Sequence, residues 1–247
     1  MHYFIGSLYG NYNNYLTIKE NLNLKEHDEL WILGDCLDGN DEHPEECIEI
    51  IYDIMNSPNI HLILGDHEYN HIMHFASIYQ KDNHDAWEER IHNMDISGTP
   101  LLSYIEQNLD EEEKDDIFGF LIQECEITNF ITIGDNHFYL VHGFPSVFLN
   151  DLTLWQIQTV EGEPDFTQSN FISAIKSDPS ISKFLNAENI NLNYSNTFVI
   201  CSHQYLNDLS GLKFENNIFL LGENKPDEFI CVLGIDAAGW FIKKIIY

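Results

Sequence analysis

Aspartate and histidine side chains stand at the ends of several apolar runs in this chain of 247 residues. Four of them come at or just after such an end: Asp35, Asp66, His142 and His203. Carboxylates and imidazoles are the side chains that hold hard and borderline divalent cations at fixed geometry. If the runs are neighbouring strands, their ends converge. We therefore expect these four residues to bind one cation.

The spacing of apolar residues predicts the strands and helices that position these side chains. Short apolar runs at 2–6, 30–34 and 60–65 each end in glycine followed by a polar residue. Helix-like stretches at about 12–25 and 44–56 lie between them. This β-α-β-α-β alternation predicts parallel strands with right-handed crossovers. Ligand sites in such sheets lie at the carboxyl ends of the strands, where the candidate ligands stand.

The second half of the chain changes character. Residues from about 70 to 130 are mostly helical in pattern and very acidic. Strand signals then return in four apolar runs, at 130–133, 138–141, 198–201 and 218–221. We found no internal repeat or linker. The order predicts an α/β protein in which residues 1–247 form a single domain, with two packed sheets, helices outside and a helical insert around 70–130.

Five short segments occur together with this alternation: Gly6-Ser7-Leu8-Tyr9-Gly10, Gly34-Asp35-Cys36-Leu37-Asp38, Gly65-Asp66-His67-Glu68, Val141-His142-Gly143 and Ser202-His203. The set resembles the calcineurin-like metallophosphoesterases, whose motifs read GDxHG, GDxxDRG, GNHE, VHAG and GH. Within them it is most similar to bacterial Ser/Thr protein phosphatases and symmetrical dinucleoside tetraphosphatases. The stretch 97–104 resembles the family's GGxxTLxSY segment, and Leu154-Trp155 resembles its LWxR segment. The resemblance covers about residues 3–205 and implies a two-sheet β sandwich flanked by helices.

The resemblance implies a ligand set for a metal ion. In the family two ions share the aspartate that aligns with Asp35. The other ligands of the second ion align with Asp66, His142 and His203. These four side chains can all act as ligands, so we expect one divalent or transition metal ion, Mn, Zn or Fe.

The resemblance also implies an acid. The family's GNHE histidine, here His67, donates a proton to the leaving oxygen. The second aspartate of GDxxDRG, here Asp38, orients that imidazole, as a carboxylate commonly does for a catalytic histidine.

Several positions depart from the family pattern. The first ion's own ligands should come from GDxHG, but the chain has Ser7 and Tyr9 there. The phosphate-binding arginine after Asp38 is replaced by Gly39, and the arginine of LWxR aligns with Ile157. These degenerate positions remove one metal site and the electrostatic stabilisation of a phosphoryl group.

Two hypotheses about function follow from these departures. The first is a divergent metal-dependent phosphoesterase, a hydrolase of the Ser/Thr phosphatase type with one metal site and weak or atypical activity on a phosphoester substrate. The second is a catalytically inactive pseudophosphatase that uses the scaffold to bind a protein partner. Asp66 replaces an asparagine of the family, which should tighten cation binding and weaken phosphate binding.

Composition limits the partners. The formal net charge is −30, with 11 lysines and arginines, of which Arg90 is the only arginine. Such an acidic protein should repel nucleic acid and anionic membranes, so we expect neither as a partner. No run of about 18 apolar residues suggests a membrane span. Five scattered cysteines fit free thiols in a reducing cytoplasm.

A cysteine and several histidines have both a functional and a structural interpretation. Cys36 stands beside Asp35, yet a cysteine here is more often a small buried apolar group. Five further histidines cluster within residues 61–92 and allow either a second metal site or a surface group on a helical insert: His61, His71, His74, His84 and His92.

Overall fold

We describe the fold from a computed structural model of the chain. The structure describes residues 1–79, 98–143, 196–202, 212–215, 217–222 and 230–245.

The chain begins with alternating strands and helices. These elements are β1 (His2–Ile5), α1 (Tyr12–Leu22), β2 (Glu29–Leu33), α2 (Pro44–Met55), β3 (Ile60–Ile63) and α3 (Asp66–Tyr79). Two helices and a series of strands follow: α5 (Pro100–Asn108), α6 (Glu111–Gln123), β4 (Thr128–Ile133), β5 (Asn136–Val141), β6 (Thr197–Cys201), β7 (Leu212–Glu215), β8 (Ile218–Leu221), β9 (Ile230–Asp236) and β10 (Gly239–Ile245).

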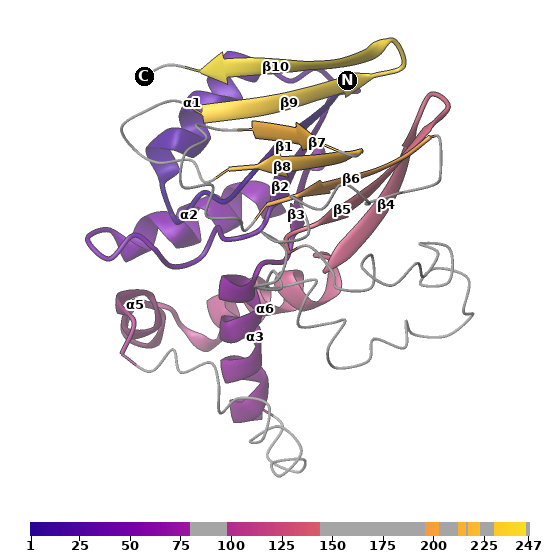
Figure 1. Cartoon of the computed structure of the whole chain (residues 1–247). Helices are drawn as coiled ribbons and strands as arrows, with labels where there is room; N and C mark the ends of the chain where they lie inside the picture. Colours follow the sequence, from indigo (N-terminus) through magenta and orange to yellow (C-terminus); the bar gives the residue numbers. More distant parts are fainter. Residues whose placement is uncertain (80–97, 144–195, 203–211, 216, 223–229, 246–247) are drawn as a thin grey trace.

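The strands form two five-stranded sheets, which lie one against the other in Figure 1. The first has the order β10-β9-β1-β2-β3, with β1, β2 and β3 parallel as the alternation predicts. Its antiparallel half comes from the C-terminal hairpin, because β9 pairs with β1 and β10 pairs with β9. The second sheet has the order β4-β5-β6-β8-β7, and its central strands β5, β6 and β8 are parallel.

Side-chain alternation in β2 shows how the layers are held together. Leu30 and Ile32 are fully buried in the cluster that also contains residues of α1 and α2. Trp31 and Leu33 belong to a second cluster, which they share with strands of the other sheet. Successive residues of a strand point to opposite faces, so the first sheet is covered on both faces.

Local signals fix the helix starts. Asn11 accepts a hydrogen bond from the Asn14 amide at the beginning of α1, and Thr99 does the same for the Leu102 amide before α5. The acidic run around Asp110 is a capping box with Glu113 at the start of α6. The acidic stretch therefore begins a helix, as its charge near the positive end of the helix dipole favours.

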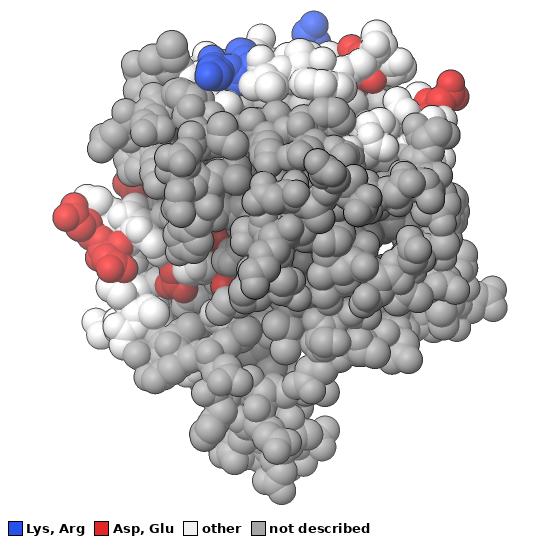
Figure 2. Space-filling model, in the orientation of Figure 1, with Lys and Arg blue, Asp and Glu red and all other residues white. Residues whose placement is uncertain are grey.

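The predicted fold class is confirmed: the protein has two packed sheets flanked by helices. Helices α3, α5 and α6 occupy the part of the chain where a helical insert was predicted. Figure 2 shows basic side chains at the top of the molecule, where β10 runs, and acidic ones at its left flank. Within the described residues, none of the helices has the length and apolar character needed to cross a membrane.

Candidate metal centre

Three of the predicted ligands come from the carboxyl ends of neighbouring strands. Asp35 follows β2, Asp66 begins α3 just after β3, and His142 follows β5 in the other sheet. Asp35 lies at the turn out of its strand with a φ of 56°, a left-handed conformation that aspartate tolerates better than most residues. The site therefore lies where the two sheets meet, at the ends of their strands.

The three side chains converge. One ligand atom from each of Asp35, Asp66 and His142 can be chosen so that all lie within 4.8 Å of one another. The His142 Nε2 atom is 3.3 Å from Asp35 Oδ2 and 3.4 Å from Asp66 Oδ1. Asp35 and His142 are completely buried. Two carboxylates and an imidazole in this arrangement suit a divalent cation.

A backbone contact fixes the orientation of the imidazole. The Nδ1 atom of His142 lies 2.6 Å from the Leu33 carbonyl oxygen, which can only accept, so Nδ1 carries the proton. In the neutral ring Nε2 then has the lone pair and faces the two carboxylates. Gly34 makes room for this contact, because a Cβ there would lie 2.4 Å from His142 Nδ1. This is the tautomer that a metal-binding histidine needs.

The electrostatics of the site favour positive charge. Burial alone would lower the pKa of His142, but the charges of Asp35 and Asp66 and the Leu33 carbonyl raise that pKa to about 9. The protonated imidazole thus balances the buried carboxylates in the protein alone. A bound cation would take over that role, with the imidazole neutral.

Glu68 anchors the loop that carries Asp35. Its carboxylate is fully buried and accepts hydrogen bonds from the amides of Asp35 and Cys36, at 2.9 and 2.6 Å. It also accepts from the amides of Leu37 and Gly65, at 2.8 and 2.9 Å. One side chain on α3 therefore ties the turn after β2 to the turn after β3.

The predicted acid pair stands beside this centre, with a third member. His67 Nδ1 lies 3.6 Å from Asp38 Oδ2, so the two are close enough for an ion pair. His71 Nε2 is nearer to the same oxygen, at 2.8 Å, and is completely buried. The carboxylate of Asp38 is therefore shared by two imidazoles one helical turn apart on α3.

Both members of the predicted pair have shifted pKa values. Burial acts to raise the pKa of Asp38, but hydrogen bonding to His67 and His71 lowers it to about 2. Burial acts to lower the pKa of His67, but Asp38 and the charges of Asp35 and Asp66 raise it to about 9. At neutral pH His67 therefore holds a proton, as an acid must.

Ser7, which aligns with a metal ligand of the family, contacts the same Asp35 oxygen that His142 approaches. Its hydroxyl lies 3.0 Å from Asp35 Oδ2, to which it donates a hydrogen bond, and 3.3 Å from the hydroxyl of Ser202. The Ser7 amide also donates to the Ser202 hydroxyl. Both serines are fully buried. Asp35 Oδ2 thus accepts a hydrogen bond from an uncharged hydroxyl.

Tyr9 and Gly39 occupy neighbouring space. A Cβ at Gly39 would lie 2.7 Å from the Tyr9 Cβ and 3.1 Å from its ring. The Tyr9 ring also packs edge-on against His67, with 5.8 Å between ring centroids. Two positions that depart from the family pattern therefore contact each other. The aromatic ring at one leaves no space for a side chain at the other.

Two predicted positions cannot be placed. His203 and Ile157, like the Leu154-Trp155 segment, lie outside the described residues. The structure thus brings together Asp35, Asp66 and His142 but gives no position for the fourth predicted ligand.

The sequence reasoning missed the roles of His71 and Glu68. Treating His71 as an exposed histidine was wrong, because its side chain is buried against Asp38. Its spacing of four residues from His67 was the available signal. Nothing in the sequence pattern indicated that Glu68 would accept four amide hydrogen bonds.

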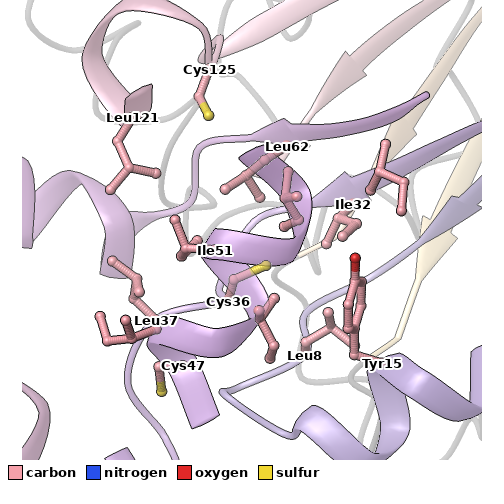
Figure 3. Packing of buried hydrophobic residues seen from close by; sticks show 14 of the residues in the cluster. Leu8, Tyr15, Ile32, Cys36, Leu37, Cys47, Ile51, Leu62, Leu121 and Cys125 are labelled. Carbon is pink, nitrogen blue, oxygen red and sulfur yellow. The ribbon is translucent and has the colours of Figure 1, made fainter. Parts of the chain in front are cut away.

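The cysteines near the site are structural. Cys36 is completely buried, and burial raises the pKa of its thiol well above the usual value. Figure 3 shows it packed among Leu37, Ile51 and other apolar side chains. Such a thiol stays protonated and unreactive, which agrees with its interpretation as a small apolar group.

Comparisons with known proteins support the fold. No family model matches the chain. A symmetrical bis(5'-nucleosyl)-tetraphosphatase of Wigglesworthia glossinidia brevipalpis is 29% identical over 119 residues, which is 46% of this chain and 42% of that protein. The chain thus aligns with less than half of that relative's length.

Solved structures match over the whole chain. A serine/threonine phosphatase from Saccharomyces cerevisiae superposes with a TM-score of 0.60 at 14% identity, covering 100% of this chain and 79% of the other. A metallophosphoesterase from Sphaerobacter thermophilus gives a TM-score of 0.51 at 14% identity, covering 100% and 88%. The protein therefore has the fold of the calcineurin-like metallophosphoesterases, and the resemblance seen in its motifs is confirmed at that level.

Proposed function

We propose that this protein is a divergent metal-dependent phosphoesterase that binds one metal ion and hydrolyses a phosphoester slowly or on an atypical substrate. The observation that carries the proposal is the convergence of Asp35, Asp66 and His142 on one point. The fold and the tetraphosphatase relative support a phosphoester as the substrate class.

The residues present fit a divalent ion. Two buried carboxylates supply negative charge, and His142 presents Nε2 to them because Leu33 fixes its Nδ1 proton. An ion bound there would act as a Lewis acid and lower the pKa of a bound water. Manganese, zinc and iron all accept this mixed oxygen and nitrogen ligand set.

The chain's own residues supply the proton. His67 follows Asp66 at the start of α3, and its pKa of about 9 keeps it protonated at neutral pH in the metal-free protein. We assign it the donation of that proton to the leaving oxygen, with Asp38 holding the imidazole. Because Asp38 also pairs with His71, its carboxylate stays ionised throughout.

The departures from the family explain why activity should be weak. Ser7 meets Asp35 with a hydrogen bond where a second ion would need a strong ligand. Gly39 carries no charge for a phosphoryl group, and Tyr9 fills the adjacent space. Two-ion clamping of the attacking and leaving oxygens is therefore lost, and with it much of the stabilisation of the transition state.

Metal content tests the first part of the proposal. Protein purified without chelator should contain one transition metal ion per chain, and Mn²⁺ or Zn²⁺ should titrate apoprotein to the same ratio. His142→Ala should weaken binding by more than about 100-fold, since even the loss of a ligand's hydrogen-bonding partner costs 10–100-fold. His137→Ala is the matched control, because His137 is in β5, the strand that His142 follows, and contacts Thr132 and Phe130. A protein that ignores both ions refutes the site.

Catalysis is tested separately with an aryl phosphate and the metal-loaded protein. His67→Ala should retain the metal and lose turnover by about 10²–10⁴-fold, the usual contribution of a general acid. Turnover that survives this change undiminished would remove His67 from the mechanism. A metal-loaded wild type with no turnover on any phosphoester would favour the alternative, a pseudophosphatase that binds a partner protein.

A further inference from the structure

Strand β10 is an exposed edge with an unusual sequence. It lies at the end of the first sheet, and within the described residues no strand pairs with its outer side. Trp240, Phe241 and Ile242 are 48%, 41% and 42% exposed. Three consecutive large apolar side chains on a sheet edge are a template for pairing with another strand.

The side chains of β10 alternate between two faces. Phe241 packs on Tyr3, and Lys243 donates from its Nζ to the Asn21 carbonyl at the end of α1. Trp240 points the other way and meets Phe219 of the second sheet edge-on. By the two-residue period of a strand, Ile242 and Lys244 lie on the same face as Trp240.

The strand has a two-part composition centred on Ile242. Its first half is aromatic, with Trp240 and Phe241, and its second half is basic, with Lys243 and Lys244. Figure 2 shows basic side chains at the left and centre of this top edge and acidic ones toward its right. A strand built in this way is complementary to a reversed copy of itself.

We propose that β10 pairs with β10 of a second copy of this chain, antiparallel, about a two-fold axis at Ile242. Opposite residues in an antiparallel pair share a face and lie close enough for their side chains to touch. With the axis at Ile242, Lys244 lies opposite the partner copy's Trp240, and Lys243 opposite its Phe241. Lys244 then faces an aromatic ring, an attractive cation–π arrangement, while the Lys243 ammonium keeps its bond to the Asn21 carbonyl. No lysine lies opposite a lysine.

A second copy fits this edge better than an acidic peptide does. Lysines on an edge strand commonly prevent pairing, but here the two-fold relation places them opposite rings instead of each other. The strand supplies both halves of its own complement, and the resulting interface is the self-complementary kind that makes closed dimers. An acidic peptide would use the lysines alone and leave the apolar half exposed.

Salt dependence separates these partners. Each chain carries a formal net charge of −30, so two copies repel each other at low salt. Raising NaCl from about 0.1 M to about 1 M shortens the Debye length from about 10 Å to about 3 Å and should strengthen the dimer. Sedimentation velocity of the full chain over a concentration series measures this. A wild type that stays monomeric at every concentration in both salts overturns the proposal, as does an acidic peptide that binds the monomer at this edge.

Two lysine substitutions make a matched pair. Ile242→Lys places two like charges at the two-fold axis and should abolish the dimer. Ile122→Lys changes an isoleucine that is 55% exposed on α6, away from this edge, and should leave the dimer intact. Circular dichroism checks that both variants fold. Equal loss, or no loss, in the two variants contradicts the proposal.

A cross-link tests the register directly. Residues on the axis of an antiparallel pair have Cα atoms about 4.5–5.5 Å apart, within the range of a disulfide. Ile242→Cys should therefore oxidise to a covalent dimer, whereas Ile122→Cys should not. The five native cysteines are all buried, so the background is low. Failure of Ile242→Cys to cross-link in a protein that still dimerises would reject this register.

Discussion

Asp35 has two groups of neighbouring side chains, and the two groups differ in their chemistry. On one side, Asp66 and His142 present charged or lone-pair atoms to a common point, and the Leu33 carbonyl holds the imidazole in place. On the other side, the Ser7 hydroxyl donates a hydrogen bond to Asp35 Oδ2 and lies 3.3 Å from the Ser202 hydroxyl. The first side suits a cation. The second gives Asp35 Oδ2 a hydrogen bond from an uncharged group.

The difference shows that the position aligned with a ligand of the family's first ion is filled by a buried serine. Ser7 is completely buried and hydrogen-bonded, and Tyr9 packs against the backbone position that lacks a side chain at Gly39. Tyr9 and Gly39 therefore form a contacting pair, and Ser7 is held separately by Asp35 and Ser202. Reverting one of them should disturb its neighbours.

The largest effect is expected when metal ligands are introduced at Ser7 and Tyr9. Ser7→Asp with Tyr9→His restores the two family ligands and should raise the metal content from one ion to two per chain. Without metal, the new carboxylate beside Asp35 should lower stability by about 3 kcal/mol, the cost of a buried charge without a partner.

Elemental analysis and denaturant unfolding with and without Mn²⁺ measure both effects. Ser7→Asn with Tyr9→His serves as the control, because it has similar size and no added charge. If the aspartate variant still binds one ion, the second side is blocked by more than its missing ligands.

A smaller effect is expected at Glu68, which joins the turns after β2 and β3. Glu68→Gln leaves one carbonyl oxygen and an NH2 group facing four amide donors. Leaving buried donors unsatisfied should lower the free energy of unfolding by about 2 kcal/mol. Glu49→Gln, on the exposed face of α2, should change it by less than about 0.5 kcal/mol. Urea unfolding compares the two, and equal effects would deny Glu68 its anchoring role.

The smallest effect measures the packing between Tyr9 and Gly39. Gly39→Ala combines a φ of +83° with a contact 2.7 Å from the Tyr9 Cβ, and should cost about 2 kcal/mol. In a Tyr9→Gly background the contact is gone, so the cost should fall to about 1 kcal/mol. Gly98→Ala provides the control for backbone strain alone, because Gly98 has a φ of +91° and open space around it. The same cost in both backgrounds would show that the two positions are independent.

Much of this arrangement could be predicted because its signals are local. Asp35 and Asp66 each follow an apolar run, and the parallel pairing of β2 with β3 brings these two ends together. His142 follows β5 of the other sheet, so its approach depends on the packing of the two sheets. The order of α/β units followed by strands likewise predicted the two sheets. The ligand role of these residues remains a prediction that metal analysis must test.

What the sequence could not show depends on contacts between distant segments. Glu68 is recognisable as an anchor only once the turns after β2 and β3 are adjacent in space. His71 carried a weak local signal, its spacing from His67, but its burial follows from the position of Asp38. The contact between Ser7 and Ser202 likewise joins residues that are 195 positions apart in the sequence.

The position of β1 within its sheet has a consequence for the order of assembly. Its parallel neighbour β2 is synthesised soon after it, but its other neighbour is β9, so that His2 pairs with Ile235. Closing so long a loop is slow, because its entropy is lost before the contacts form. During synthesis one edge of β1 therefore stays unpaired until residues 230–236 have been made. Strand β10 follows these residues and pairs with β9 at the edge of the sheet. The pairing of β1, the first strand made, is therefore among the last steps in forming the first sheet.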